Sequence, residues 1–220
     1  MADFAALRRT MVDGQVRTAD VTDRSLIQAM SEVPRERFVP EQAEELAYLD
    51  LDLPVGAPGQ GRRLLKPMVL GKMLQALNIS SGERALDVGC ATGYGAAVLA
   101  RLAGSVVALE EDADLARQAA ATLGSLGVEN VTVVQGPLAA GHVAPAPYDV
   151  ILVEGRVELA PEKLCRQLAD GGRLVCIQGA GPAAKATLYQ RDGDDITSRQ
   201  IFDASGPVLP GFAQPAAFVF

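Results

Sequence analysis

The stretch Arg84-Ala85-Leu86-Asp87-Val88-Gly89-Cys90-Ala91-Thr92-Gly93-Tyr94 decides the fold of this chain. Residues 85–88 form an apolar run that predicts a buried strand, Gly89 and Gly93 permit a tight turn, and residues 95–101 continue with helical spacing. Glycines let the backbone approach a ligand, and the first turn of a helix has unpaired N–H groups. The stretch therefore predicts a nucleotide-binding strand-turn-helix unit.

The spacing of the glycines selects the kind of nucleotide. Ala91 occupies the position where a G-x-G-x-x-G dinucleotide fingerprint has its second glycine, so the loop reads D-x-G-x-x-x-G, and it is not a P-loop either. Asp87 stands where a carboxylate can face an ammonium group. The run Ser105 to Glu110 predicts a second strand ending in an acid, roughly twenty residues after the loop, where such an acid binds ribose hydroxyls. A ribose and a cationic tail without phosphate indicate S-adenosylmethionine as cofactor.

The predicted cofactor site includes the loop and the ends of the strands that follow it. Its residues are Asp87, Gly89, Cys90, Ala91, Thr92, Gly93, Tyr94, Glu110, Glu111, Gln135 and Gly136. The alternative is a glycine turn without a ligand, but the order of loop, Asp87 and Glu110 argues against it. We predict no metal site, because Glu154 has no second ligand near it in the sequence.

Composition limits the class of protein. With 220 residues, 49% of them hydrophobic, the chain is long enough for one large globular domain. It contains no run of about eighteen apolar residues and no basic start before an apolar stretch, so we expect no membrane segment and a cytoplasmic location. A net charge of -7 without a basic stripe argues against nucleic acid as partner. The scattered cysteines 90, 165 and 176 are expected to be reduced.

The pattern along the chain predicts an N-terminal helical cap and substrate loop (residues 1–65) before an S-adenosylmethionine-binding domain (residues 66–220), together forming one structural unit. In the cap we expect helices over 3–17 and from about 23 to Pro34. Apolar runs that alternate with helices predict a mostly parallel sheet with an antiparallel edge. The further helices are expected at 67–77, 114–126 and 161–168, and the further strands at 131–134, 150–153, 173–177, 186–189, 196–202 and 216–220.

Several motifs resemble the protein-L-isoaspartate O-methyltransferase family over most of the chain. They are Val33-Pro34-Arg35-Glu36-Arg37-Phe38-Val39-Pro40, Ala47-Tyr48-x-Asp50-x-x-Leu53-Pro54-x-Gly56 and Gly93-Tyr94-x-Ala96-Ala97-Val98-Leu99-Ala100. The resemblance implies an α/β fold of the Rossmann-like methyltransferase type, with a seven-stranded sheet and helices on both faces. It also implies an enzyme of protein repair that uses S-adenosylmethionine to methylate altered aspartates in damaged peptides or proteins.

The sequence departs from the family pattern at three places. Members carry Thr-Ile-Ser-Gln-Pro with the serine at the substrate carboxylate, and here Leu65 replaces that serine. Members also carry Gly-Asp-Gly-x-x-Gly-Trp with the aspartate near the adenine, and here Pro137 and His142 replace the aspartate and the tryptophan. After the fourth strand of the parallel series, the family's Thr-Ala-Ala becomes Glu154-Gly155-Arg156.

The chemistry of methyl transfer needs few catalytic groups. A carboxylate acceptor is already ionised at neutral pH, so no general base is required and His142 is expected to be an ordinary loop residue. Arg62, Arg63 and Lys66 are candidates for holding an anionic acceptor, with solvated loop charges as the alternative. Two other functions stay open: methylation of another small or peptidic anion, and a non-catalytic interaction module. The sequence does not indicate an oligomeric state.

Overall fold

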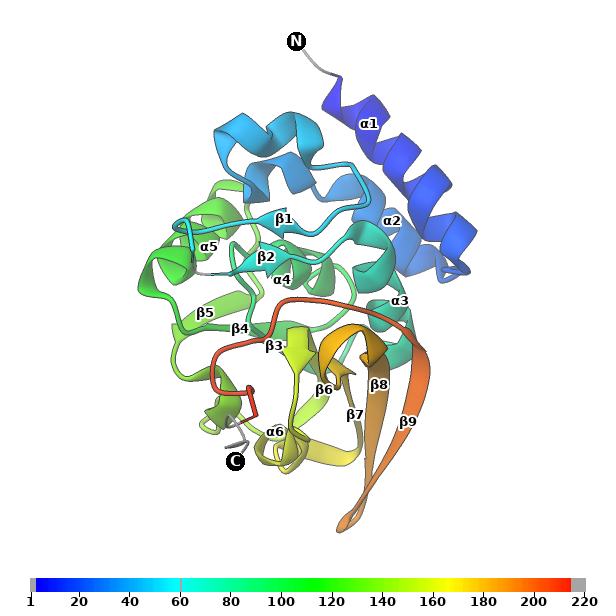
Figure 1. Cartoon of the computed structure of the whole chain (residues 1–220), viewed down its shortest axis with the longest axis vertical. Coiled ribbons are helices and arrows are strands. Elements are labelled where there is room, and N and C mark those ends of the chain that lie inside the picture. The colour runs from blue at the N-terminus through cyan, green and yellow to red at the C-terminus, as the bar shows by residue number, and fades with distance from the viewer. Residues whose placement is uncertain (1–2, 60, 215–220) are drawn as a thin grey trace, which may run out of the picture.

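The computed structural model describes residues 3–59 and 61–214, and a seven-stranded sheet lies at its centre (Figure 1). The strand order is β5-β4-β3-β6-β7-β8-β9, with parallel pairing from β5 to β7 and antiparallel pairing of β8 and β9 at the edge. The predicted mostly parallel sheet is thus confirmed. The strands are β3 (Arg84–Val88), β4 (Ser105–Glu110), β5 (Val131–Gln135), β6 (Tyr148–Val157), β7 (Leu168–Gln178), β8 (Lys185–Asp192) and β9 (Asp195–Asp203).

The order of the strands reverses at β3. From β3 the chain moves outward to β4 and β5, then returns to the other side of β3 to form β6. Ligands of open α/β sheets bind beyond the carboxyl ends of the strands at such a reversal. The residues that follow β3, β4 and β6 therefore meet at one edge of the sheet.

The two faces of the sheet are covered unequally. Helices α3 (Pro67–Leu77), α4 (Tyr94–Leu99) and α5 (Ala113–Ser125) cover one face together with the N-terminal segment. The other face packs against the single-turn α6 (Glu162–Cys165), a 3₁₀ turn (Leu138–Ala140) and the C-terminal segment around Leu209 and Phe212. Among the helices in the described ranges, none has the length and apolarity needed to cross a membrane.

The N-terminal cap consists of short helices and turns. Helix α1 (Phe4–Met11) continues as a π-helical turn (Val12–Val16) and a 3₁₀ turn (Arg17–Ala19), so the predicted single helix over 3–17 is wrong beyond Met11. Gly14 lies in the π-helical turn, and its low helix propensity favours such a change of winding. The remaining cap elements are α2 (Arg24–Glu32), 3₁₀ turns at Arg35–Phe38 and Glu41–Leu46, and the antiparallel pair β1 (Leu53–Pro54) and β2 (Arg63–Leu64).

Three predicted boundaries need correction. Strand β6 continues past Val153, because the Arg156 N–H donates to the Pro207 carbonyl (2.7 Å) and the Leu209 N–H donates to the Arg156 carbonyl (3.0 Å). Helix α6 is only one turn long, because Leu168 already pairs with Tyr148 in the sheet. For the same reason β7 begins at Leu168 and takes in the glycines that were expected to precede it. The strand predicted at 216–220 lies outside the described residues.

The cap and the sheet domain share one apolar core. Buried residues of α1, α2, α3 and the sheet belong to the same cluster. Gly71 of α3 packs closely against the cap, since a Cβ atom there would lie 3.2 Å from Val16 Cγ1 and 3.5 Å from Met30 Sδ. Arg35, fully buried, also joins the parts, because its guanidinium lies 4.6 Å from the centre of the Tyr94 ring at the start of α4. Within the cap, its Nε donates to the Ala47 carbonyl and its Nη2 to the Leu65 carbonyl, both at 2.8 Å. This packing supports the prediction that residues 1–65 and 66–220 are one unit.

A substitution at Gly71 tests that prediction. Gly71→Val adds a branched side chain where no room exists, so we expect the free energy of unfolding to fall by about 2 kcal/mol or more, in a single transition. Urea denaturation followed by circular dichroism measures both quantities. The matched control is Gly124→Ala, because Gly124 is exposed on α5 with open space around it and alanine should stabilise that helix by up to ~1 kcal/mol. Two separate unfolding transitions in the wild type would contradict the prediction.

Candidate functional site

The loop between β3 and α4 has the conformation that its glycines permit. Its backbone takes positive φ at Gly89 (78°), Ala91 (51°) and Gly93 (95°), a region that disfavours residues with a side chain. A Cβ atom at Gly93 would lie 3.2 Å from Ala119 Cβ, so the loop packs closely against α5. The predicted glycine turn is therefore present at the carboxyl end of β3.

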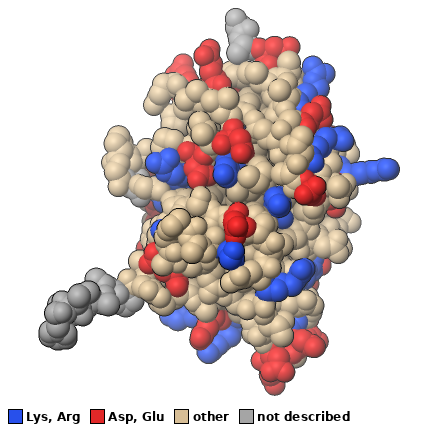
Figure 2. Space-filling view, turned by 45° about the vertical axis from the view of Figure 1, so that its right-hand side comes forward, with Lys and Arg blue, Asp and Glu red and all other residues tan. Residues whose placement is uncertain are grey.

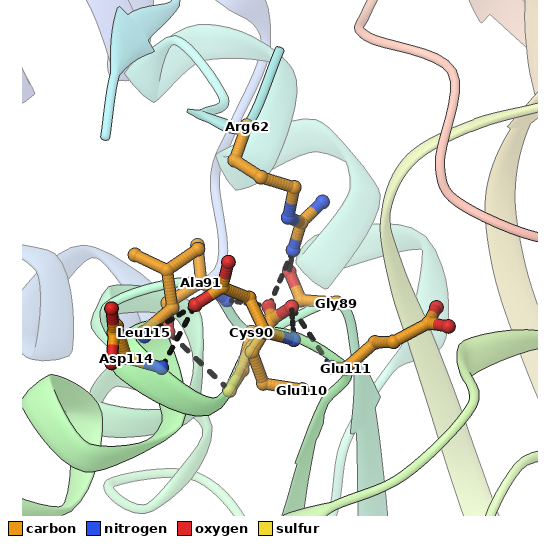
Figure 3. Close-up of polar contacts among 9 residues, drawn as sticks. Arg62, Gly89, Cys90, Ala91, Glu110, Glu111, Asp114 and Leu115 are labelled. Carbon is orange, nitrogen blue, oxygen red and sulfur yellow. Dashed lines mark hydrogen bonds and ion pairs between the residues drawn. The ribbon is translucent and has the colours of Figure 1, made fainter. Parts of the chain in front are cut away.

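The Glu110 carboxylate, at the end of β4, accepts hydrogen bonds from four donors (Figure 3). Its Oε2 accepts from Arg62 Nη2 (2.5 Å) and from the Ala91 N–H (2.8 Å). Its Oε1 accepts from the N–H groups of Glu111 (2.9 Å) and Asp112 (3.1 Å). An ionised carboxylate offers about four lone-pair sites. Glu110, only 1% exposed, therefore has its accepting capacity filled.

Arg62 reaches into the predicted cofactor site. Figure 3 shows its guanidinium directed toward Glu110 and Gly89, and Nη2 also donates to the Gly89 carbonyl at 3.0 Å. The side chain is 5% exposed, and neither its Nε nor its Nη1 has a hydrogen-bond partner in the described part of the chain. Leu209 of the C-terminal segment lies on the same loop, since a Cβ atom at Gly89 would be 3.3 Å from its Cδ1 and from Arg62 Nη2. A cation and an apolar side chain thus cover the glycine loop.

The other two predicted cations lie elsewhere. Arg63 follows Arg62 in an extended segment, so the two side chains point to opposite sides. The exposed Arg63 donates through Nη1 to the Asp52 carbonyl at 3.1 Å. Lys66 precedes α3, where its backbone N–H donates to Asp52 Oδ1 at 2.8 Å. Of the three cations, the structure brings only Arg62 together with the predicted cofactor residues.

Two buried carboxylates lie side by side at the reversal of strand order. Asp87 pairs in register with Leu152, so Asp87 and Glu154, two residues further along β6, are on the same face of the sheet. Asp87 is fully buried and Glu154 is 2% exposed. Both Asp87 oxygens and Glu154 Oε1 lack a donor among the residues described. A Cβ atom at Gly95 would collide with the Glu154 carboxylate, so only glycine leaves it this room.

The surroundings of this pair favour a retained proton. Burial raises the pKa of Asp87 well above its usual range, and the negative charge of Glu154 raises it further. Burial likewise raises the pKa of Glu154, while a hydrogen bond with Asp87 partly offsets this increase. Two adjacent buried carboxyl groups cannot both ionise without a cation between them. The pair therefore holds a proton at neutral pH.

Arg35 and Tyr94 form the wall beside this pair. The Arg35 guanidinium lies 4.6 Å from the centre of the Tyr94 ring, and Arg35 Nη1 and Tyr94 Oη are further buried polar atoms without a partner in the described ranges. Arg35 was not among the predicted site residues, although it belongs to the Val-Pro-Arg motif that carried the resemblance. Leu209 had no signal in the sequence, because its place depends on where the C-terminal segment returns to β6.

The remaining predicted residues lie around the same edge. Thr92 Oγ1 donates to the Phe38 carbonyl at 2.5 Å, which ties the loop to the cap. Burial raises the pKa of the Cys90 thiol, so that group stays protonated. The Gly136 N–H donates to the Glu110 carbonyl at 3.0 Å, and exposed Gln135 lies beside exposed Glu111, donating to its carbonyl at 3.5 Å.

The hydrogen bonds of His142 are made by its backbone groups. Its N–H donates to Gln167 Oε1 (3.0 Å), and its carbonyl accepts from the Tyr148 hydroxyl (2.7 Å). Both contacts agree with the expectation of an ordinary loop residue. No three His, Cys, Asp or Glu side chains gather in a possible metal site within residues 3–59 and 61–214.

Comparison with known proteins identifies the family. The profile of the family described as "Protein-L-isoaspartate(D-aspartate) O-methyltransferase (PCMT)" matches residues 8–204. The chain belongs to this family. Protein-L-isoaspartate O-methyltransferase 1 of Rhodopseudomonas palustris (strain HaA2) is 42% identical over 202 residues, which are 91% of this chain and 81% of that protein. The protein-L-isoaspartate O-methyltransferase of Roseiflexus sp. (strain RS-1) is 37% identical over 215 residues, 97% of each chain.

Solved structures of the protein-L-isoaspartate O-methyltransferase family share the fold. One structure with that name superposes with a TM-score of 0.82 at 26% identity, covering 93% of this chain and 66% of that chain. A second, from Plasmodium falciparum and described as a complex with S-adenosyl-L-homocysteine, gives a TM-score of 0.77 at 19% identity and covers 92% and 97% of the two chains. At that identity the second shows the fold alone. The predicted family and Rossmann-like fold are confirmed.

The pH dependence of stability tests the account of the Asp87–Glu154 pair. A carboxyl whose pKa is higher in the folded than in the unfolded chain destabilises the fold as pH rises from the unfolded toward the folded value. Glu154→Gln removes that group, so we expect it to raise the free energy of unfolding by about 1–3 kcal/mol at pH 8 and by less at pH 5. Denaturant titrations at the two pH values measure this, with exposed Glu129→Gln as control. A gain that does not depend on pH would contradict the account.

Proposed function

We propose that this chain is an S-adenosylmethionine-dependent methyltransferase that esterifies the isoaspartyl carboxylate of damaged proteins, as its family name describes. The observation that carries the proposal is the site at the reversal of strand order. There the glycine loop, the Glu110 carboxylate and the unpartnered Asp87 carboxylate lie at one edge of the sheet. This arrangement offers acceptors for an ammonium group and, once Arg62 leaves Glu110, for ribose hydroxyls.

The residues of the site fit the cofactor on two counts. Asp87 is a buried acceptor that receives no hydrogen bond from residues other than Glu154 in the described part of the chain. Gly89 presents bare backbone beside the Arg62 guanidinium, since a Cβ atom there would lie 3.3 Å from Arg62 Nη2. When bound, S-adenosylmethionine supplies an electrophilic methyl group on its sulfonium. Glu110 would hold the ribose hydroxyls, but its accepting sites are filled. Of the four groups that donate to Glu110, only Arg62 donates from a side chain. Arg62 therefore has to release Glu110 when the cofactor binds.

Arg62 then becomes available to the acceptor. A carboxylate acceptor needs no general base, so the protein has to orient it and exclude water. Leu65 cannot donate a hydrogen bond from its side chain and is fully buried, so the acceptor carboxylate must be held by another group. A guanidinium binds a carboxylate through two parallel hydrogen bonds, and Arg62 already has unpaired Nε and Nη1 donors. We assign Arg62 this role rather than Arg63 or Lys66.

A groove next to Arg62 gives a peptide access to the site. It has a volume of about 450 Å³ and is lined by Pro40, Gln42, residues 54–59 and residues 61–63. On the face of the molecule drawn in Figure 2, Lys and Arg are interspersed with Asp and Glu and form no basic stripe. This distribution supports a protein rather than a nucleic acid as partner. Cys90, Cys165 and Cys176 are free and buried, which supports a reducing, cytoplasmic setting.

Methyl transfer to a peptide pair tests the proposed function. Labelled S-adenosylmethionine is incubated with a peptide that contains isoaspartate and with its normal aspartyl twin, and we expect label only in the first. Label in neither peptide, from a protein that still binds S-adenosylhomocysteine, would contradict the proposal. That result would point to another anionic acceptor or to a non-catalytic module.

The arginine variants give the matched control in the same assay. We expect Arg62→Ala to raise the KM for the isoaspartyl peptide about tenfold, because one charge-assisted contact is lost. Arg63 lines the groove but its side chain points away from the glycine loop, so Arg63→Ala should raise the KM by less than about twofold.

A further inference from the structure

Apart from the hydrogen bond between its two carboxyl groups, the Asp87–Glu154 pair receives no hydrogen bond from any residue that the structure describes. Asp87 Oδ1, Asp87 Oδ2 and Glu154 Oε1 are buried without a donor in the described part of the chain. The nearest cations are engaged elsewhere: Arg35 donates to the carbonyls of Ala47 and Leu65, and Arg62 donates to Glu110 and the Gly89 carbonyl. Buried carboxylates without donors are costly, so their retention points to a ligand that brings the donors.

We propose that Glu154 acts with Asp87 to bind the α-ammonium group of the cofactor's amino-acid portion. The inference rests on the proposed function, because it names how that site holds that cofactor. A primary ammonium carries three N–H donors and one positive charge. The pair offers three oxygens on one face of adjacent strands that receive no hydrogen bond from other described residues, and Gly95 leaves the Glu154 carboxylate free of side-chain contact at that point.

The negative charge of Glu154 favours a role in binding the cofactor's ammonium over a role in binding the methyl acceptor. The acceptor in the proposed reaction is a carboxylate, and an ionised Glu154 would repel it. The ammonium is attracted by the same charge. Glu154 also lies beside Asp87, the residue before the glycine loop that is expected to face the ammonium. Glu154 is therefore a binding residue for the cofactor rather than a base.

Binding of the ammonium should release the proton that the pair retains. The charged and titratable groups that face the pair are Arg35 and Arg62 from the cap, Cys90 and Tyr94 from the glycine loop and α4, and Glu110 from β4. None of these supplies a donor to the three oxygens. Affinity for a ligand with the ammonium should consequently rise with pH, because the carboxyl pair gives up its proton more readily as pH increases.

A comparison of two ligands tests the inference. S-adenosylhomocysteine carries the ammonium, whereas 5′-methylthioadenosine has the same nucleoside and thioether without the amino acid. Isothermal titration with the full chain should show that Glu154→Gln weakens S-adenosylhomocysteine binding by about tenfold or more and changes methylthioadenosine binding by less than about twofold. Titration in buffers of different ionisation enthalpy should show fewer protons released by the variant. The exposed Glu129→Gln serves as control.

The outcomes distinguish this inference from the proposed function. Equal loss for both ligands, no loss for either, or a wild type that does not bind S-adenosylhomocysteine would overturn the role of Glu154. A selective loss for S-adenosylhomocysteine in a protein that fails to methylate the isoaspartyl peptide would support the inference and overturn the proposed acceptor.

Discussion

The buried Glu110 carboxylate is the constraint on which the site depends. An ionised carboxylate is costly in the interior unless its lone pairs are filled, and Glu110 gathers donors from three separate segments. The Ala91 amide fixes the glycine loop, the Glu111 and Asp112 amides fix the start of α5, and Arg62 fixes the strand that carries the acceptor-side loop. The conformation of this ligand-binding edge therefore follows from one anion at the end of β4.

The buried carboxyl groups of the site differ in how the protein satisfies their hydrogen bonds. Glu110 is fully satisfied by the protein, whereas the Asp87–Glu154 pair receives no hydrogen bond from any other described residue and retains a proton. The first arrangement stabilises the protein without a ligand, and the second favours a ligand that carries a positive charge. In the proposed mode of binding Arg62 connects them, because the cofactor that satisfies the pair would also compete with Arg62 for Glu110. Binding of the cofactor and exposure of an anion-binding guanidinium would then be one event.

Much of this architecture could be predicted from local sequence. The apolar runs predicted the strands, and the glycines with Asp87 and Glu110 indicated the edge of the sheet at which the structure brings them together, because each signal lies within a few residues of the structure it specifies. Contacts between distant segments could not be predicted in this way. Arg62 joins Glu110 across 48 positions, and Leu209 reaches the glycine loop only because the C-terminal segment pairs with Arg156. The proximity of Glu154 to Asp87 likewise required the strand order.

A crystal structure of the chain with S-adenosylhomocysteine tests the central claim, that the cofactor takes the place of Arg62 on Glu110. The account predicts that the ribose hydroxyls donate to the Glu110 carboxylate and that the Arg62 guanidinium has left it. A ligand bound at this edge with the Arg62–Glu110 ion pair still intact would contradict the account.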